Sequence, residues 1–248
     1  MKKTPKRLIQ VLGIIILLII ILSLGYALKA KSEMKKMTPA ETGDLTEDIF
    51  SIKDTFVNLF LIKDGDEYIA IDCGNDISVV SDELNKHNVD PDDVSTVLLT
   101  HSDFDHVAAL KLFKNAKIFF SKNEEQMING ETARFPFFHN KISRMDYTLL
   151  VDQQIFQIGN LTVKGILTRG HTPGSMCYLI NDKYLFTGDA LSIKNGKIDK
   201  FNKFFNMDTE TATESIGRIT ELIGVEYIFS AHYGYSDDYQ NAVKDWKN

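Results

Sequence analysis

Hydrophobic residues are most concentrated near the N-terminus of the chain. Residues 8–28 contain no charged side chain, and four basic residues precede them. A stretch of this length can cross the hydrocarbon core of a bilayer as one helix. The pattern predicts an uncleaved membrane anchor over residues 1–30. A secretory signal peptide, cleaved near residues 25–27, is the alternative.

The charges on either side of this stretch indicate its orientation. A short basic N-terminus is typical of a segment that stays in the cytoplasm, although four lysines within residues 29–36 weaken the bias. We therefore expect a single-pass protein of the cell membrane. Its large C-terminal part would lie outside the cytoplasm.

Beyond a polar linker at residues 31–46, the pattern changes to short apolar runs bounded by turn residues. These runs predict strands, and apolar spacings of three and four predict helices. The expected strands are 49–52, 55–62, 67–71, 94–100, 116–120, 154–158, 161–167, 176–180, 184–187 and 225–230. The expected helices are 77–87, 107–113 and 209–222, a short one near 123–127, and a last one that holds Trp246. On the 209–222 helix, the inward residues are expected to be Ile216, Ile219, Leu222 and Ile223. The folded domain is therefore expected over residues 47–248.

The most distinctive polar stretch follows the buried strand expected at residues 94–100. Four side chains that can bind metal occur within six residues: His101, Asp103, Asp105 and His106. The first three share one parity and His106 points elsewhere, so a loop here could serve two neighbouring metal positions. A single histidine in such a place would more simply be a solvated turn residue. Two histidines and two aspartates together favour a metal site.

Three further candidate ligands, His171, Asp189 and His232, each stand just beyond an expected strand. Asp72 likewise ends the strand expected at 67–71. Each residue alone is typical of an ordinary turn. Together with the first loop, the three candidate ligands form a pattern that is hard to obtain by accident.

Charge narrows the classes of partner. Residues 1–36 hold eight basic residues and one acidic residue of the 28 and 34 in the whole chain, so the remainder has a net charge of about −13. A domain this acidic lacks the basic surface that nucleic-acid binding requires, so no nucleic-acid partner is expected. The two cysteines, Cys73 and Cys177, are too few for a disulfide scaffold and are expected to be small buried hydrophobic residues.

Five motifs, in their order and spacing, resemble those of the metallo-β-lactamase superfamily over residues 45–248. They are Asp72-Cys73-Gly74, residues 101–106, His171-Thr172-Pro173-Gly174-Ser175, Thr187-Gly188-Asp189 and Ala231-His232. The resemblance implies an α/β fold, the αββα sandwich, with two metal ions at the edge where strand-end loops converge. The turn at His171 is similar to that of the glyoxalase-II-like branch.

The resemblance also implies a role for each motif residue. One metal ion would bind His101, Asp103 and His171, the other would bind Asp105, His106 and His232, and Asp189 would bridge the two. We call these the first and second metal positions. A hydroxide between the ions would be the nucleophile, and Asp105 would be the catalytic residue that orients it. Asp72 would support the ligand loop.

Asp103 departs from the common family pattern, which has a second histidine at this position. Zinc remains the expected metal, but a third carboxylate would remove the one net positive charge that two divalent ions, two carboxylates and a hydroxide leave. This change favours harder ions such as manganese or iron. Flavodiiron reductases of the superfamily resemble the chain in carrying a carboxylate here.

Residues 130–147 follow no period and mix aromatic with basic side chains. They are expected to form either an ordinary surface loop or a lid over an anionic, partly apolar substrate. The residues expected to contact the substrate are Arg134, Phe137, Phe138 and His139.

The sequence therefore predicts a membrane-anchored metal-dependent hydrolase. Its substrate would be a small molecule such as an ester, thioester or lactone. Two alternatives belong to other classes: a diiron redox enzyme that needs a separate flavin partner, and a catalytically silent, membrane-tethered binding module. The complete set of seven ligands argues against the second.

Overall fold

The computed structural model describes residues 5–135 and 138–246 of the chain. These residues form two compact units, one ending at Met37 and the other beginning at Thr38. Each unit is described by itself below.

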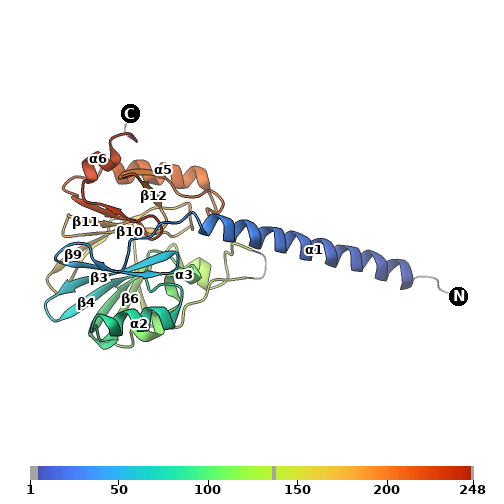
Figure 1. Ribbon diagram of the computed structural model, residues 1–248, viewed down its shortest axis with the longest axis horizontal. Helices are drawn as coiled ribbons and strands as arrows, with labels where there is room; N and C mark the ends of the chain where they lie inside the picture. Colours follow the sequence, from blue (N-terminus) through green and yellow to red (C-terminus); the bar gives the residue numbers. More distant parts are fainter. Residues whose placement is uncertain (1–4, 136–137, 247–248) are drawn as a thin grey trace. The chain divides into compact units, whose positions relative to one another are not determined.

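The first unit is a single helix, α1 (Pro5–Met34), drawn in blue in Figure 1. Its part Leu8–Met34 is long and apolar enough to cross a membrane, by length and composition only. Thirty residues of helix extend about 45 Å, more than a bilayer's hydrocarbon core requires. The helix continues into the predicted linker, because Glu33 pairs with Lys29 at 2.5 Å and Lys36 at 2.8 Å around its last turn.

The second unit contains two large sheets and one hairpin. The seven-stranded sheet has the order β1 (Gly43–Asp44), β2 (Ile49–Asp54), β3 (Val57–Asp64), β4 (Glu67–Ile71), β5 (Val94–Leu98), β6 (Lys117–Ser121) and β7 (Tyr147–Leu150). The six-stranded sheet has the order β15 (Tyr235–Ser236), β14 (Tyr227–Phe229), β11 (Tyr184–Phe186), β10 (Met176–Ile180), β9 (Leu161–Leu167) and β8 (Ile155–Ile158). The hairpin pairs β12 (Leu191–Lys194) with β13 (Lys197–Lys200).

The two-residue alternation of apolar side chains explains why the sheets form inner layers. On β3, Phe60 and Ile62 join a core with β10 and Phe229, whereas Leu59 and Leu61 join a core on the opposite face of the sheet. Alternate side chains of β10 likewise lie in two cores: one set in the core that lies between the two sheets, the other in a third core on the far side of the second sheet. A sheet that is apolar on both faces must be covered on both, so each sheet packs on the other and on helices.

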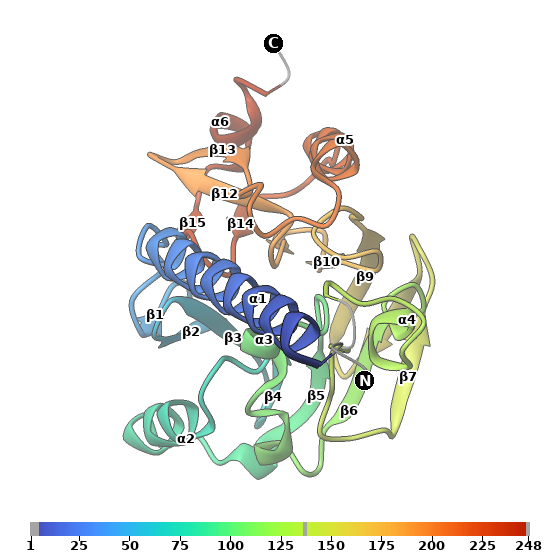
Figure 2. The ribbon, with the colours of Figure 1, turned by 90° about the vertical axis from the view of Figure 1, so that its right-hand side faces the viewer.

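Helices complete the αββα order on the two outer faces. Helix α2 (Ile77–Lys86) covers the first sheet with Val80 and Leu84, and α5 (Thr209–Thr220) with α6 (Tyr239–Val243) covers the second. Figure 2 shows α2 at the bottom of the view and α5 and α6 at the top. Each of the three begins at an aspartate whose carboxylate accepts backbone N–H bonds: Asp76, Asp208 and Asp238. Shorter helical turns are η1 (Pro91–Asp93), α3 (Phe104–Val107), η2 (Leu110–Leu112) and α4 (Glu125–Ile128).

Several predicted elements differ from the structure. The helix expected at 107–113 begins inside the ligand motif as α3, then continues as the separate turn η2. Ile223, expected to face inward, is 90% exposed, because α5 ends at Thr220 and its period no longer applies. Trp246 follows α6 instead of lying within it. The β12–β13 hairpin was not predicted, although Asn195 and Gly196, with φ of 52° and 71°, form the two-residue turn that favours hairpins.

Candidate metal centre

Two parallel strand pairs bring the predicted ligands to one edge of the sandwich. Strands β4 and β5 run parallel, so the residues that follow them, Asp72 and His101, lie side by side. Strands β11 and β14 are also parallel, which brings Asp189 next to His232. The two sheets are joined at this edge, where Met176 N–H donates to Thr100 O at 2.9 Å. The site therefore depends on the approach of two sheets rather than on any one loop.

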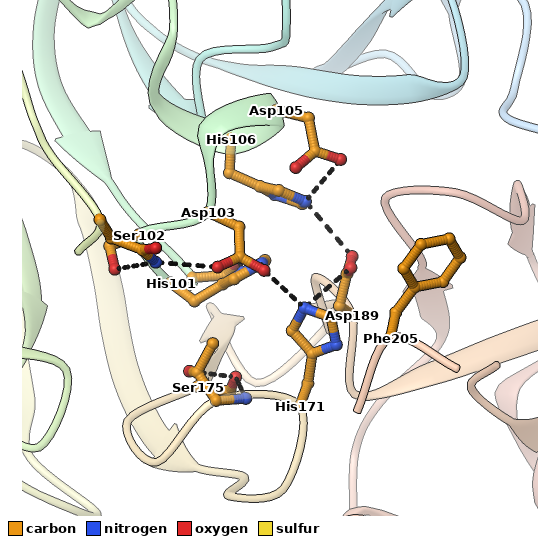
Figure 3. Close-up of polar contacts among 12 residues, drawn as sticks. His101, Ser102, Asp103, Asp105, His106, His171, Ser175, Asp189 and Phe205 are labelled. Atoms are coloured by element: carbon orange, nitrogen blue, oxygen red, sulfur yellow. Dashed lines mark hydrogen bonds and ion pairs between the residues drawn. The ribbon is translucent and has the colours of Figure 1, made fainter. Parts of the chain in front are cut away.

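All seven predicted ligands converge in the structure. Three groups have ligand atoms within 4.8 Å of one another: His101, Asp103 and His171; His101, His106 and Asp189; and Asp105, His106 and His232. Figure 3 shows Asp189 lying between the two ends of the cluster. Its Oδ2 is 3.3 Å from His171 Nε2, and its Oδ1 is 3.2 Å from His232 Nε2. Asp189 therefore has one oxygen available to each metal position.

Each of the four histidines uses Nδ1 for a neighbour and directs Nε2 into the cluster. His106 Nδ1 lies 2.8 Å from Asp72 Oδ2, and His232 Nδ1 lies 2.6 Å from Phe56 O. The Nδ1 atoms of His101 and His171 lie near Thr100 Oγ1 and Asn206 Oδ1. A proton on Nδ1 satisfies these acceptors and leaves the Nε2 lone pair free to bind a cation.

The cluster also contains buried polar atoms whose chemistry fits a metal ion. Among the described residues, His101 Nε2, His106 Nε2 and Asp189 Oδ1 have no hydrogen-bond partner. A buried acceptor without a partner is costly, and a divalent cation would satisfy all three. Imidazole nitrogens mixed with carboxylate oxygens suit zinc and also accommodate iron or manganese.

Asp72 supports the loop that carries the ligands. Its two oxygens accept hydrogen bonds from Thr100 N at 2.7 Å and Thr100 Oγ1 at 2.8 Å, besides contacting His106. Asp72 has a φ of 60°, a conformation that costs energy for a residue other than glycine. A Cβ at Gly188 would lie 2.5 Å from Thr100 Oγ1, so glycine allows the Asp189 turn to approach this loop.

The charges of the cluster shift the pKa values of its members. Burial opposes ionisation of Asp189, but the histidines around it hold the pKa of its carboxyl well below the usual range. The reverse holds at His106, where Asp189 and Asp72 raise the pKa against the effect of burial. His171 differs, because burial and the nearby Arg134 lower its pKa to about 4. His171 therefore stays neutral near pH 7.

Arg134 contacts the predicted ligands directly, a role that the sequence did not indicate. Its Nη2 lies 2.5 Å from Asp103 Oδ2 and 2.9 Å from His171 Nε2. This guanidinium holds the pKa of Asp103 well below its usual range although burial opposes ionisation. Without a metal ion, Arg134 therefore compensates the negative charge of Asp103, a contact that the expectation about Asp103 had not counted.

Of the other residues expected in the lid, the two that the structure describes do not lie at the predicted ligands. Phe138 is 73% exposed, and His139 is exposed beside Gly130. Phe137 lies outside the described residues. Asn140 of the same segment was not predicted to take part, yet its Nδ2 donates to Asp103 Oδ1 at 2.8 Å.

Glu124 is a second residue that sequence reasoning missed. It is fully buried between the two loops that carry the ligands of the first metal position. One oxygen accepts from Ser102 N at 2.9 Å and Ser102 Oγ at 2.6 Å. The other accepts from Thr172 Oγ1 at 2.6 Å and Gly174 N at 3.2 Å. Burial raises the pKa of the Glu124 carboxyl.

Comparison with known proteins agrees with the fold. The sequence profile of the metallo-β-lactamase superfamily matches residues 52–232. The chain belongs to this superfamily. Several of its relatives are named as hydrolases.

Three similar proteins illustrate the range of this family. A probable polyketide biosynthesis zinc-dependent hydrolase of Bacillus velezensis is 35% identical, and the match covers 50% of this chain and 49% of the length of that hydrolase. A hydroxyacylglutathione hydrolase of Glaesserella parasuis is 29% identical over 60% of this chain and 54% of its own. A solved B3 metallo-β-lactamase with an active-site glutamic acid has a TM-score of 0.65 at 17% identity, covering 84% of this chain and 86% of its own. The chain spans about half the length of the Bacillus hydrolase, and the solved structure shows the fold alone.

Proposed function

We propose that this chain is a membrane-anchored, metal-dependent hydrolase that cleaves an ester or thioester of a small acyl substrate. The observation that carries the proposal is the convergence of seven ligand side chains around buried Nε2 and carboxylate atoms that lack partners. A hydroxyacylglutathione hydrolase and an atrochrysone carboxyl ACP thioesterase of Aspergillus chevalieri, 23% identical over 86% of this chain and 61% of its own, are among its relatives. These relatives support thioesters as the first substrates to test.

We assign two divalent ions, zinc first, to the site. His101, Asp103 and His171 would hold one ion, and Asp105, His106 and His232 the other, with Asp189 shared. When bound, such ions lower the pKa of coordinated water and polarise a substrate carbonyl.

Asp105 is the residue that we propose for proton transfer. Its Oδ2 lies 3.4 Å from His232 Nε2 and 3.8 Å from His106 Nε2, so this oxygen faces the ligands. The side chain is 23% exposed, whereas Asp189 is 4% exposed, which makes Asp105 the carboxylate that water reaches more readily. A carboxylate held in this way can orient an attacking water and accept its proton. Asp72 fixes the ring of His106 and with it the loop that positions Asp105.

Replacing Asp105 tests the proposal. Asp105→Asn keeps the size of the side chain but removes its charge and its basicity, so we expect at least about a hundredfold loss of kcat/KM. Activity is measured with a panel of ester, thioester, lactone and phosphodiester substrates after zinc analysis of each protein. Asp237→Asn, a change of the same kind at an exposed position, is the control and should leave activity unchanged. Equal activity of Asp105→Asn and the wild-type protein would refute the assignment.

The anchor is the second part of the proposal. Helix α1 is long and apolar enough to span a bilayer, and large apolar side chains along it are exposed, as at Leu22 with 71%. Lys31 in its last turn and lysines beyond it are suited to contact anionic headgroups. The catalytic unit would then lie on the outer side of the cell membrane.

A further inference from the structure

A guanidinium nitrogen lies where the first metal ion would bind. Arg134 Nη2 is 2.5 Å from Asp103 Oδ2 and 2.9 Å from His171 Nε2. Those two atoms are themselves 3.1 Å apart, and both belong to the ligand group of the first position. A neutral His171 with its proton on Nδ1 offers its Nε2 lone pair to either partner. Arg134 and a metal ion therefore need the same two lone pairs.

Arg134 is held in this place by more than one contact. Its Nε donates to Asp103 Oδ1 at 3.2 Å, which makes the pair with this carboxylate two-pronged. Its Nη1 donates to Phe205 O, and its Nη2 also lies 3.2 Å from His171 O. The side chains of Arg134 and Asp103 are 18% and 17% exposed. A charge pair this sheltered from water is a substantial competitor for any cation.

Among the described residues, no arginine or lysine forms an ion pair with a carboxylate of the second metal position. Within residues 5–135 and 138–246, the ion-pair partners of Asp105 and Asp189 are all histidines: His106, His171 and His232. Histidine Nε2 atoms favour a cation there instead of replacing it. The two positions of one cluster thus differ in the cost of admitting an ion.

We propose that Arg134 is a built-in competitor of the first metal ion, so that binding of that ion displaces the guanidinium and moves residues 130–135 and 138–146. The inference rests on the ligand assignment of the proposed function. Because Arg134 competes only at the first position, the second position should fill at a lower metal concentration than the first. The competition also couples the segment that carries Arg134 and Asn140, both in contact with Asp103, to metal occupancy.

Zinc titration of Arg134→Gln tests the competition. Full-length protein in detergent is stripped with a chelator and titrated against a chromophoric zinc indicator, with the stoichiometry confirmed by native mass spectrometry. Removing a charge-assisted pair should raise the affinity of the first position at least about tenfold and leave the second nearly unchanged. The control is Arg144→Gln, since Arg144 lies in the same segment but contacts Asp146 and Phe113 O instead of the ligands.

A second readout separates displacement from a simple effect of charge. Loss of a positive charge alone would strengthen zinc binding without moving the segment. Hydrogen exchange of residues 130–135 and 138–146 should therefore rise when the wild-type protein takes up its second zinc ion, and should already be high in Arg134→Gln without zinc. The competition is refuted if zinc binds tightly at one position and Arg134→Gln changes neither the zinc affinity of the other position nor the hydrogen exchange of the segment. If neither protein binds zinc, the ligand assignment fails as well.

Discussion

Asp103 and Arg134 act as a pair, and the energetics of either residue depends on the other. Removing one partner of a sheltered ion pair leaves the remaining charge without compensation, which costs more than the pair itself contributes. Asp103 also has a second hydrogen-bond partner, because both Asn140 and Arg134 donate to its Oδ1. A substitution at Asp103 therefore tests the contacts of the guanidinium as well as metal preference.

Asp103→His should destabilise the chelator-stripped protein by about 3 kcal/mol, since Arg134 loses its carboxylate while it remains largely buried. The same substitution in an Arg134→Gln background should cost much less. Urea unfolding of the wild-type protein, the two single variants and the double variant gives the coupling free energy. If the losses in unfolding free energy of the two single variants simply add in the double variant, Asp103 and Arg134 do not stabilise the fold as a pair.

Single residues differ in how far the sequence could predict them. His101, His171, Asp189 and His232 follow apolar runs directly, so the pattern located them at strand ends. The contacts of Arg134 and Glu124 link segments that come together only in the folded chain. Arg134 reaches Asp103 from a stretch without periodicity, and Glu124 lies within the short helix expected near residues 123–127. Sequence pattern carries no signal for contacts of this kind.

At the scale of elements, Glu124 joins two loops that leave different sheets. The Ser102 loop follows β5 and the Thr172 loop follows β9, and four hydrogen bonds to one carboxylate fix their separation. Because His101 and His171 neighbour these contacts in sequence, the geometry of the first metal position depends on Glu124. Glu124 would therefore position the proposed ligands of this site without being one of them.

Glu124→Gln replaces one acceptor oxygen by a donor that would face Thr172 Oγ1 and Gly174 N or the two donors of Ser102. We expect zinc affinity at the first position to fall about 10- to 100-fold, as for other residues that orient metal ligands. The second position should change little. Glu125→Gln is the matched control, since the Glu125 side chain accepts a hydrogen bond from Tyr147 OH at 3.0 Å and, among the described residues, none from the Ser102 or Thr172 loops. An equal loss at both positions would point to general loosening of the fold instead.

Elements with strong alternation were predicted well, and those set by turn chemistry were not. Strands β3, β9 and β10 place successive side chains in different cores, which the alternating or continuous apolar pattern reflects. The β12–β13 hairpin depends on two residues at its turn and on pairing that a short run cannot reveal. Helix α3 interrupts the ligand motif because His106 N–H donates to Asp103 O, a local turn inside a stretch read as a loop.

At the scale of the whole molecule, the apolar helix and the catalytic unit imply a defined topology. An uncleaved anchor predicts that native full-length protein begins near Met1 and sediments with membranes. An outward orientation predicts that protease added to intact cells digests the catalytic unit, as detected with an antibody against its C-terminal part. Cleavage near residue 28 would instead show a signal peptide, and protection in intact cells but not in lysed ones would reverse the orientation.

The ligands of the metal positions come from both sheets, and this origin has a consequence for unfolding. Four of them follow β5 of one sheet, and His171, Asp189 and His232 follow strands of the other. Bound ions would act as cross-links between the layers, closing chain segments from residue 101 to residue 232. To unfold, the sandwich would first have to pull these bonds apart, so occupancy would lengthen the lifetime of the folded enzyme as well as enable its chemistry. In the proposed outward orientation, the ions that support hydrolysis would also make the folded protein more durable.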